Sequence, residues 1–371
     1  MAEVMAHETV AKKISDWYEE IKKHNTESAE ALREQLLTDL QNMTQNQTVL
    51  LYFNLIDSRY KLLMEEYEKT DDILKTIQLN ADKEKTDQMI QYYYYFFSGM
   101  HEFYRKRFMN AINFYRIAES RLRHIPNEIE RAEFNYQVAI AYYEIRQNYF
   151  AMNHAEKALE IYKANEMYAV REAQCLMVIG CNRMDLFHYQ KAEELLQTAV
   201  HQAAKAGDPH IEALAHFNAG ICYERQEKLE EARVEFETAL DQKEHLRSAY
   251  SVRSLYMLAR VLLKQEKTDE GRFWLHKALN AAEEKNEPVY TQKLRILQHV
   301  FIDRNEEALE SAFAELRRKE LWSDVSDLSY QAAAHFKKQE KYKPAARYFQ
   351  ESIDANDQIL RLTEGIRNEN M

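Results

Sequence analysis

Small residues recur along this chain at a fixed spacing, and this repetition constrains the fold more than any other feature. Gly220 is followed by Ala232, Phe236 and Ala239, at intervals of 12, 16 and 19 residues. This order of small and aromatic positions is typical of the tetratricopeptide repeat (TPR), in which two antiparallel helices approach closely. The segment 213–240 therefore predicts a helix–turn–helix unit.

The same register returns in six other units. With Gly220 numbered as position 8, successive units start 37 to 41 residues apart, which is longer than the ~34 residues usual for this repeat. The sixth unit fits least well, because Ile296 and Glu315 stand where other units carry small residues. One helix pair cannot bury its apolar face alone, so about seven neighbouring pairs predict a TPR-like superhelical solenoid over residues 89–371. Position 20 is small in all seven units: Ala111, Ala151, Ala192, Ala232, Gly271, Ala308 and Ala345.

Composition supports an all-α fold and limits the classes of partner. Only 6 of the 371 residues are glycine and 4 are proline, which is typical of a helical protein. The formal net charge of −11 argues against direct binding to nucleic acid. No stretch is long and apolar enough to span a membrane, and three cysteines suit a reducing compartment, so we expect a cytoplasmic protein. The histidines are scattered without ligand spacing, so we expect no metal site.

Three apolar stripes at helical spacing precede the repeats, within residues 1–68. A break at residues 24–26 and a polar turn at residues 44–48 separate them. Amphipathic helices with short connections favour an antiparallel three-helix bundle. Residues 69–88 are charged and have a weak apolar stripe, so we interpret them as a partly helical linker.

The first helix of each TPR unit lines the concave surface, and a helical period places certain polar residues on that side. Asn182 and Asp185 take such positions in the third unit, and Asn218 does so in the fourth. An asparagine amide can hydrogen-bond both the N–H and the C=O of an extended peptide, and a carboxylate can pair with a basic residue. The pattern is compatible with a peptide-binding groove and equally with polar side chains that only face water.

Several segments carry a more specific resemblance. They are LLYFNLIDSRYKLLMEEY at residues 50–67, YYYYFFSGMHEFYRKRF at residues 92–108, and a longer segment at residues 129–162 that begins IERAEF. With these segments, essentially the whole chain resembles the Rap family of response-regulator aspartate phosphatases of Bacillus-type bacteria.

The resemblance implies a bundle that grips a response regulator and a TPR domain that binds a short imported signalling peptide of the Phr type. The peptide would switch the protein off. Gln47 matches a family glutamine that points into the regulator's phosphorylation site and orients the water that attacks the phosphoaspartate. Asn182, Asp185 and Asn218 match family peptide ligands. The resemblance implies no cofactor of the chain's own, because the regulator supplies the aspartate and the Mg²⁺.

Other functions remain open at this stage. The family's turn commonly carries acidic residues around its glutamine, whereas residues 44–48 read TQNQT. Some family members block a DNA-binding response regulator without dephosphorylating it, and this chain could be such a steric inhibitor. A peptide-sensing transcription factor is disfavoured by the acidic second helix, with Glu27, Glu30 and Glu34. A passive TPR scaffold is the remaining alternative.

Overall fold

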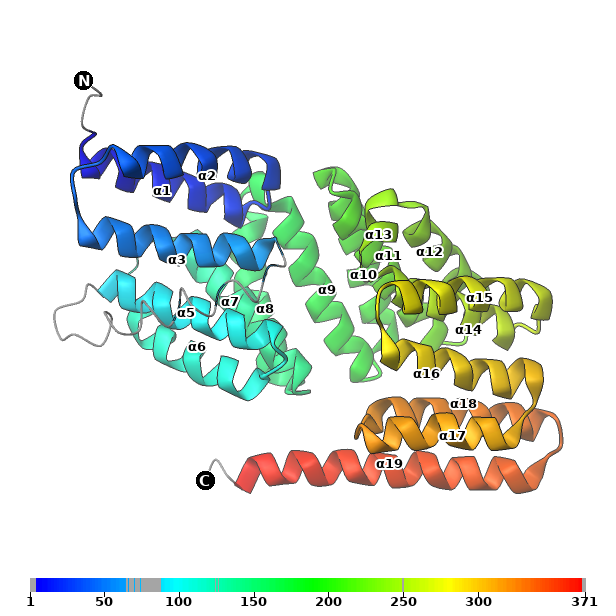
Figure 1. Cartoon of the computed structure of the whole chain (residues 1–371). Helices are drawn as coiled ribbons and strands as arrows, with labels where there is room; N and C mark the ends of the chain where they lie inside the picture. The colour runs from blue at the N-terminus through cyan, green and yellow to red at the C-terminus, as the bar shows by residue number, and fades with distance from the viewer. Residues whose placement is uncertain are drawn as a thin grey trace. The chain divides into compact units, whose positions relative to one another are not determined.

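The computed structural model describes residues 5–64, 66, 70, 74, 88–123, 125, 127–248 and 250–368, the last seven of these by their backbone only. These residues form helices, and none of them forms a strand beyond a single bridge between Met5 and Met43 (Figure 1). The all-α prediction is confirmed. No helix in this part of the chain is long and apolar enough to cross a membrane.

Three helices form the N-terminal bundle, drawn in blue in Figure 1, and helix pairs follow them. The bundle consists of α1 (His7–Lys22), α2 (Thr26–Gln41) and α3 (Gln47–Leu63). The next pairs are α5 (Gln88–Tyr104) with α6 (Phe108–Leu122), α7 (Glu128–Glu144) with α8 (Asn148–Lys163), and α9 (Ala169–Asp185) with α10 (Tyr189–Ala206). A short 3₁₀ helix, η2 (Glu166–Tyr168), precedes α9.

The later pairs are less regular. They comprise α11 (Pro209–Arg225), α12 (Leu229–Asp241), the short α13 (Lys243–Arg247), α14 (Ser251–Lys264), α15 (Thr268–Glu284), α16 (Pro288–Leu297), α17 (Glu306–Arg318), α18 (Trp322–Lys338) and the long α19 (Tyr342–Asn368). Between α16 and α17 lies a π-helix, η3 (Gln298–Asp303).

The contacts divide the chain into two compact units, residues 1–215 and 216–371. The bundle shares the first unit with α5–α10, because α3 packs on α5 and charged side chains of α1 and α3 reach α7. The predicted linker over residues 69–88 lies almost wholly outside the described residues.

The predicted register holds where small residues meet large ones. A Cβ atom added to Gly220 would lie 2.6 Å from the ring of Phe236, and one added to Gly180 would lie 2.8 Å from Leu196. In both units position 8 faces position 24 of the second helix. Glycine is required there because no other residue lets the two helices approach so closely.

In the sixth unit, the predicted register is wrong by one residue after Ile296, because the buried positions lie one residue later than predicted. Leu309 and Leu316 are fully buried, whereas Ala308 and Glu315 are half-buried. The cause is η3, because a π-turn accommodates one more residue than an α-turn and displaces every later position by one.

Candidate functional site

Gln47 is the first residue of α3, and its side chain is exposed. Asn46 caps the helix, since its side-chain oxygen accepts hydrogen bonds from the backbone N–H groups of Thr48 (3.1 Å) and Val49 (3.2 Å). These two N–H groups are therefore occupied, and the exposed amide of Gln47 is a polar group that this end of α3 offers to a partner.

The turn before Gln47 is held from its other side as well. The backbone N–H of Met5 donates to the carbonyl oxygen of Asn42 at 3.0 Å, and the N–H of Thr44 donates to the carbonyl oxygen of Met5 at 3.2 Å. The segment that precedes α1 thus clamps the α2–α3 turn. A side chain on such a turn starts from a fixed backbone, which favours reproducible placement of a reacting group.

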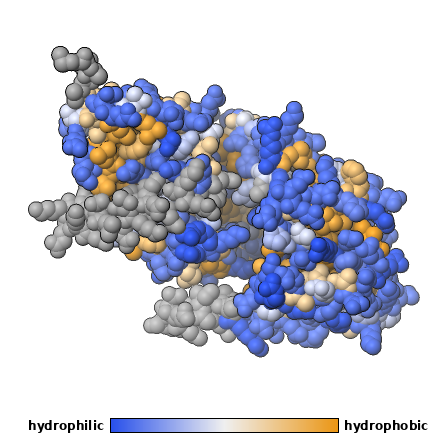
Figure 2. Space-filling model, in the orientation of Figure 1, coloured by the Kyte–Doolittle hydropathy of each residue, from blue (hydrophilic) through white to orange (hydrophobic). Residues whose placement is uncertain are grey.

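Half-buried apolar side chains lie along α2 and α3. Figure 2 shows hydrophobic surface over the bundle, next to the hydrophilic surface of neighbouring side chains. Apolar area bordered by polar groups on a small bundle is typical of a protein-binding surface. The half-buried members of the bundle core include Leu32, Leu37, Leu40, Met43 and Leu51.

A buried carboxylate, Glu133 of α7, ties the bundle to the helix pairs. Its Oε1 accepts hydrogen bonds from Arg59 of α3 (3.1 Å) and Arg171 of α9 (2.7 Å), and its Oε2 accepts one from Tyr162 (3.1 Å). Glu133 has no exposed surface, and each arginine is 2% exposed. Burial acts to raise the pKa of Glu133, but the two arginines outweigh it and hold that pKa below its ordinary value.

A second buried carboxylate, Glu130, lies one turn earlier on α7, and its pKa is shifted in the opposite direction. The hydroxyls of Tyr18 (3.1 Å) and Tyr92 (2.9 Å) donate to its Oε1, and the ammonium of Lys22 lies 3.7 Å from its Oε2. Burial raises the pKa of Glu130 to about 7, although Lys22 opposes the shift. The two glutamates therefore differ in charge state near neutral pH.

The residues predicted to bind a peptide occupy different environments. Asn182 on α9 is fully buried, which differs from the groove-facing position expected from the register. Its amide nitrogen donates to the carbonyl oxygen of Val178 at 2.7 Å, and its Oδ1 has no hydrogen-bond partner among the described residues. Asp185, at the end of α9, and Asn218, on α11 in the second unit, are half-buried.

First helices of the second unit carry charges that pair with one another. Arg260 of α14 lies 3.1 Å from Glu224 of α11 and also bonds Asp327 of α18. Lys264 lies 2.8 Å from both Glu224 and Glu227. Lys264 is thus part of an ion-pair network that links α14 to α11.

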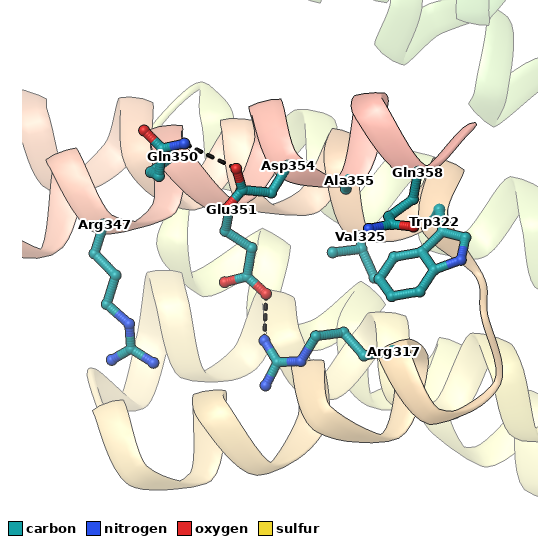
Figure 3. Close-up of a pocket in the computed structure, with 9 residues that line it drawn as sticks. All are labelled: Arg317, Trp322, Val325, Arg347, Gln350, Glu351, Asp354, Ala355 and Gln358. Atoms are coloured by element: carbon teal, nitrogen blue, oxygen red, sulfur yellow. Dashed lines mark hydrogen bonds and ion pairs between the residues drawn. The ribbon is translucent and has the colours of Figure 1, made fainter. Parts of the chain in front are cut away.

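A pocket of about 430 Å³ lies among α17, α18 and α19 (Figure 3). Its polar walls are paired internally: Glu351 bonds Arg317, and the amide of Gln350 donates to Asp354 at 2.8 Å. None of the predicted site residues lines this pocket. Among the described residues, no group of three or more His, Cys, Asp or Glu is placed to hold a metal ion.

Comparisons with known proteins cover nearly the whole chain. Residues 4–65 match the family model described as response regulator aspartate phosphatase H, N terminal. Response regulator aspartate phosphatase I of Bacillus subtilis (strain 168) is 31% identical over 361 residues, which span 96% of this chain and 92% of that protein. The chain belongs to the Rap family of response regulator aspartate phosphatases.

Other Rap relatives agree. Regulatory protein RapC of the same organism is 32% identical over 98% of each chain. The crystal structure of a Rap protein complexed with competence and sporulation factor has a TM-score of 0.83 and 31% identity, over 95% of this chain and 99% of that one. The apo form of RapI has a TM-score of 0.75 at the same identity and coverage.

The segment that matches the Rap N-terminal model coincides with α1–α3 and includes Gln47. Sequence reasoning missed Glu130 and Glu133, which connect this segment to the first helix pairs. The available signal was the spacing of two glutamates, three residues apart, on a helix that also carries Ile129, Ala132 and Phe134. Such a pair on an otherwise buried face indicates charged partners from other helices.

Proposed function

We propose that this chain binds a phosphorylated response regulator through α1–α3 and hydrolyses its phosphoaspartate. The observation that carries the proposal is the position of Gln47, exposed at the start of α3 on a turn held by Asn46 and by the Met5 backbone. Membership of the Rap family supports it at the level of the reaction class.

Hydrolysis of the phosphoaspartate requires from this chain one side chain that positions the attacking water. A water molecule attacks phosphorus in line with the bond to the aspartate oxygen, and that bond breaks to release phosphate and a free carboxylate. A glutamine amide accepts a hydrogen bond from the water through its oxygen and donates through its nitrogen, which positions the nucleophile. The regulator supplies the aspartate and the Mg²⁺, so this chain requires no cofactor of its own.

Steric inhibition of a DNA-binding response regulator is the second candidate. The relatives include both proteins named phosphatase and proteins named regulatory protein, such as RapC. The turn around Gln47 supports steric inhibition. The family's turn commonly carries acidic residues there, whereas Thr44, Gln45 and Thr48 provide no carboxylate. The same bundle surface would then hold the regulator without hydrolysis.

A short imported peptide would control either activity in the cytoplasm. Rap proteins and their structural relatives have been solved with signalling peptides, which supports this part of the proposal. Asp185 and Asn218, both half-buried, are the residues proposed to contact the peptide, with the unpartnered Oδ1 of Asn182 as a further acceptor. A peptide acts as an inhibitor if it binds the regulator-free state more tightly.

The test measures dephosphorylation of the host's response regulators, each phosphorylated with a small-molecule phosphodonor. We expect wild-type protein to accelerate the decay of one regulator, and Gln47→Ala to reduce this acceleration by about 10²-fold or more, as for other positioning groups. Gln45→Ala, at an exposed position two residues earlier, is the matched control and should retain activity.

Binding is measured on the same samples. Loss of hydrolysis with unchanged binding in Gln47→Ala confirms the phosphatase role. If wild-type protein binds a regulator but leaves the phosphoaspartate intact, steric inhibition replaces the phosphatase role. Absence of binding to every regulator of the host contradicts both.

A further inference from the structure

The pocket among α17, α18 and α19 has an apolar end and a charged end (Figure 3). The apolar end consists of the half-buried indole of Trp322 with Val325 and Ala355, and the charged end contains Glu351 and Arg317. Its volume of about 430 Å³ lies within the range of small-molecule sites. None of the residues proposed to contact the regulator or the peptide lines this pocket, so a ligand bound here would be separate from both.

Both arginines of the pocket already pair with glutamates. Arg317 bonds Glu351 of α19 and Glu310 of α17, and Arg347 bonds the same Glu310. An anionic ligand would have to compete with these two carboxylates for the guanidinium groups. The arrangement therefore does not favour an anion.

A third carboxylate at the pocket has no charged partner. Asp354 follows Glu351 by three residues, so the two lie on the same side of α19. Asp354 is exposed and accepts a hydrogen bond from the neutral amide of Gln350 at 2.8 Å, and it forms no ion pair with any described residue. Three carboxylates thus face two arginines around this pocket.

The titration of Glu351 indicates the same shortage of positive charge. Burial raises the pKa of Glu351, and Arg317 opposes this shift without cancelling it. A cation that entered the pocket would interact favourably with both Glu351 and Asp354.

The indole of Trp322 is a second group that attracts cations. Of the aromatic side chains, tryptophan binds cations most strongly over its ring. In the same unit, the Nζ atom of Lys277 lies 4.5 Å from the ring centre of Trp274, whereas no cation of the described chain lies over the ring of Trp322. Trp322 begins α18 and packs against the core of its unit, so its ring is held in place.

We propose that this pocket binds a small organic cation, a primary ammonium group carried on an apolar stem. The stem packs on Trp322, Val325 and Ala355, and the ammonium pairs with Asp354 beside the indole. A free amine and a lysine side chain of a protein partner share this chemistry.

Fluorine NMR of the full chain labelled with fluorotryptophan tests binding. The chain has three tryptophans, and Trp322→Phe identifies the resonance of Trp322. Phenethylammonium is the probe, and we expect it to shift the Trp322 resonance saturably. The resonances of Trp17, which is buried, and Trp274, which has Lys277 over its ring, should not shift. Absence of a saturable shift at Trp322 overturns the proposal.

Two matched ligands test the charge. Phenethyl alcohol has the same ring and stem without a charge and should bind about tenfold more weakly than phenethylammonium. Hydrocinnamate carries a carboxylate on the same ring and stem and should produce no saturable shift. Equal affinity for the three ligands, or tighter binding of hydrocinnamate, overturns the assignment of a cation site.

Two further probes distinguish the sources of the ammonium group. Butylammonium has the stem and the charge of a lysine side chain alone, and the tripeptide Ala-Lys-Ala with blocked ends presents both on a backbone. Tighter binding of the tripeptide assigns the site to a protein partner, and tighter binding of butylammonium assigns it to a free amine.

A variant locates the ammonium. Asp354→Asn removes the charge but retains an acceptor for Gln350, so it should weaken phenethylammonium binding about three- to tenfold with an unchanged circular dichroism spectrum. Asp357→Asn, at an exposed position of α19 outside the pocket lining, is the matched control and should retain affinity. Equal losses in the two variants would indicate non-specific attraction to the acidic helix and overturn the proposal.

Discussion

Two glutamates one turn apart illustrate how differently a buried charge behaves when its partners change. Glu133 faces two arginines and remains ionised, whereas Glu130 faces two tyrosine hydroxyls and one lysine and has a pKa of about 7. A buried ion pair adds little to stability over an apolar pair, but an unpaired buried charge is strongly destabilising. The contacts of Glu130 and Glu133 therefore fix how the bundle packs on α7 more than they add to the free energy of unfolding.

We predict that Glu133→Ala destabilises the first unit by about 3–5 kcal/mol, because Arg59 and Arg171 are left buried without a counter-charge. Urea denaturation measures the free energy of unfolding. Glu128→Ala, on the same helix with its side chain 78% exposed, is the control and should change stability by less than about 0.5 kcal/mol. Similar losses in both variants would contradict a special role for Glu133.

Glu130 makes stability depend on pH. The folded-state pKa of Glu130 is raised to about 7 from an ordinary value of 4.5, so the folded state binds its proton more tightly. Its stabilising effect is fully present below about pH 4.5 and is lost as pH rises to about 7.

We predict that wild-type protein loses about 3 kcal/mol relative to Glu130→Gln between pH 4.5 and pH 8. The difference between the two free energies of unfolding, followed by urea denaturation across this range, isolates Glu130 from the other titrating groups. A constant difference would show that Glu130 does not titrate here.

At the scale of helices and turns, the sequence predicted the helix pairs but not the left-handed residues that terminate the first helix of each pair. The first helix of almost every pair closes with a residue at positive φ: Lys106, Arg146, Phe187, Glu227, Glu266, Arg304 and Glu340 have φ between 52° and 62°. In the first of these turns, the N–H of Lys106 donates to Phe103 and that of Arg107 to Glu102, which is a Schellman motif. Glycine normally marks this motif, and none of these positions carries it.

The π-helix η3 escaped prediction for a related reason. Its six residues follow the apolar pattern of α16 without interruption, so periodicity alone does not reveal the extra residue. After η3, each structural position falls one residue later than the repeat register predicts. Arg304, rather than Asp303, has the positive φ, and Leu309, rather than Ala308, is buried in the core. Repeat spacing constrains helix existence and order, whereas backbone turns depend on local hydrogen bonds.

We predict opposite effects of glycine at two exposed lysines. Lys106→Gly should be neutral or stabilise by up to about 1 kcal/mol, because a left-handed residue with a Cβ is strained by about 1–2 kcal/mol, while glycine adds unfolded-state entropy. Lys157→Gly, in the middle of α8, should destabilise by about 1 kcal/mol. Thermal unfolding of both variants measures the difference, and the same sign at both positions would contradict this account.

At the scale of the whole chain, the family resemblance singled out Gln47, while the spacing of small residues predicted the solenoid. Gln47 lies where the resemblance implied, at the start of α3. Asn182 does not face solvent, because its position on α9 is also a core position between adjacent helices. One helical period cannot separate the groove side from the core when a helix is buried around most of its circumference.

The attachment of the bundle leads to a last prediction, about which fragment folds alone. Residues 1–68 lack α7, so the buried Lys22 and Arg59 would lose Glu130 and Glu133, and Tyr18 would lose its ring contact with Tyr93 at 5.5 Å. Residues 1–207 keep these contacts and end at Gly207, the left-handed cap of α10.

We therefore expect residues 1–207 to melt cooperatively and residues 1–68 to lack fixed tertiary structure. Trp17, buried and stacked on Phe53 at 5.6 Å, is present in both fragments, and its near-ultraviolet circular dichroism signal depends on fixed packing around its ring. The signal should be strong in residues 1–207 and absent in residues 1–68. A cooperative transition with native Trp17 signal in residues 1–68 would instead make the bundle an independent domain, and the buried glutamates would then be dispensable for its fold.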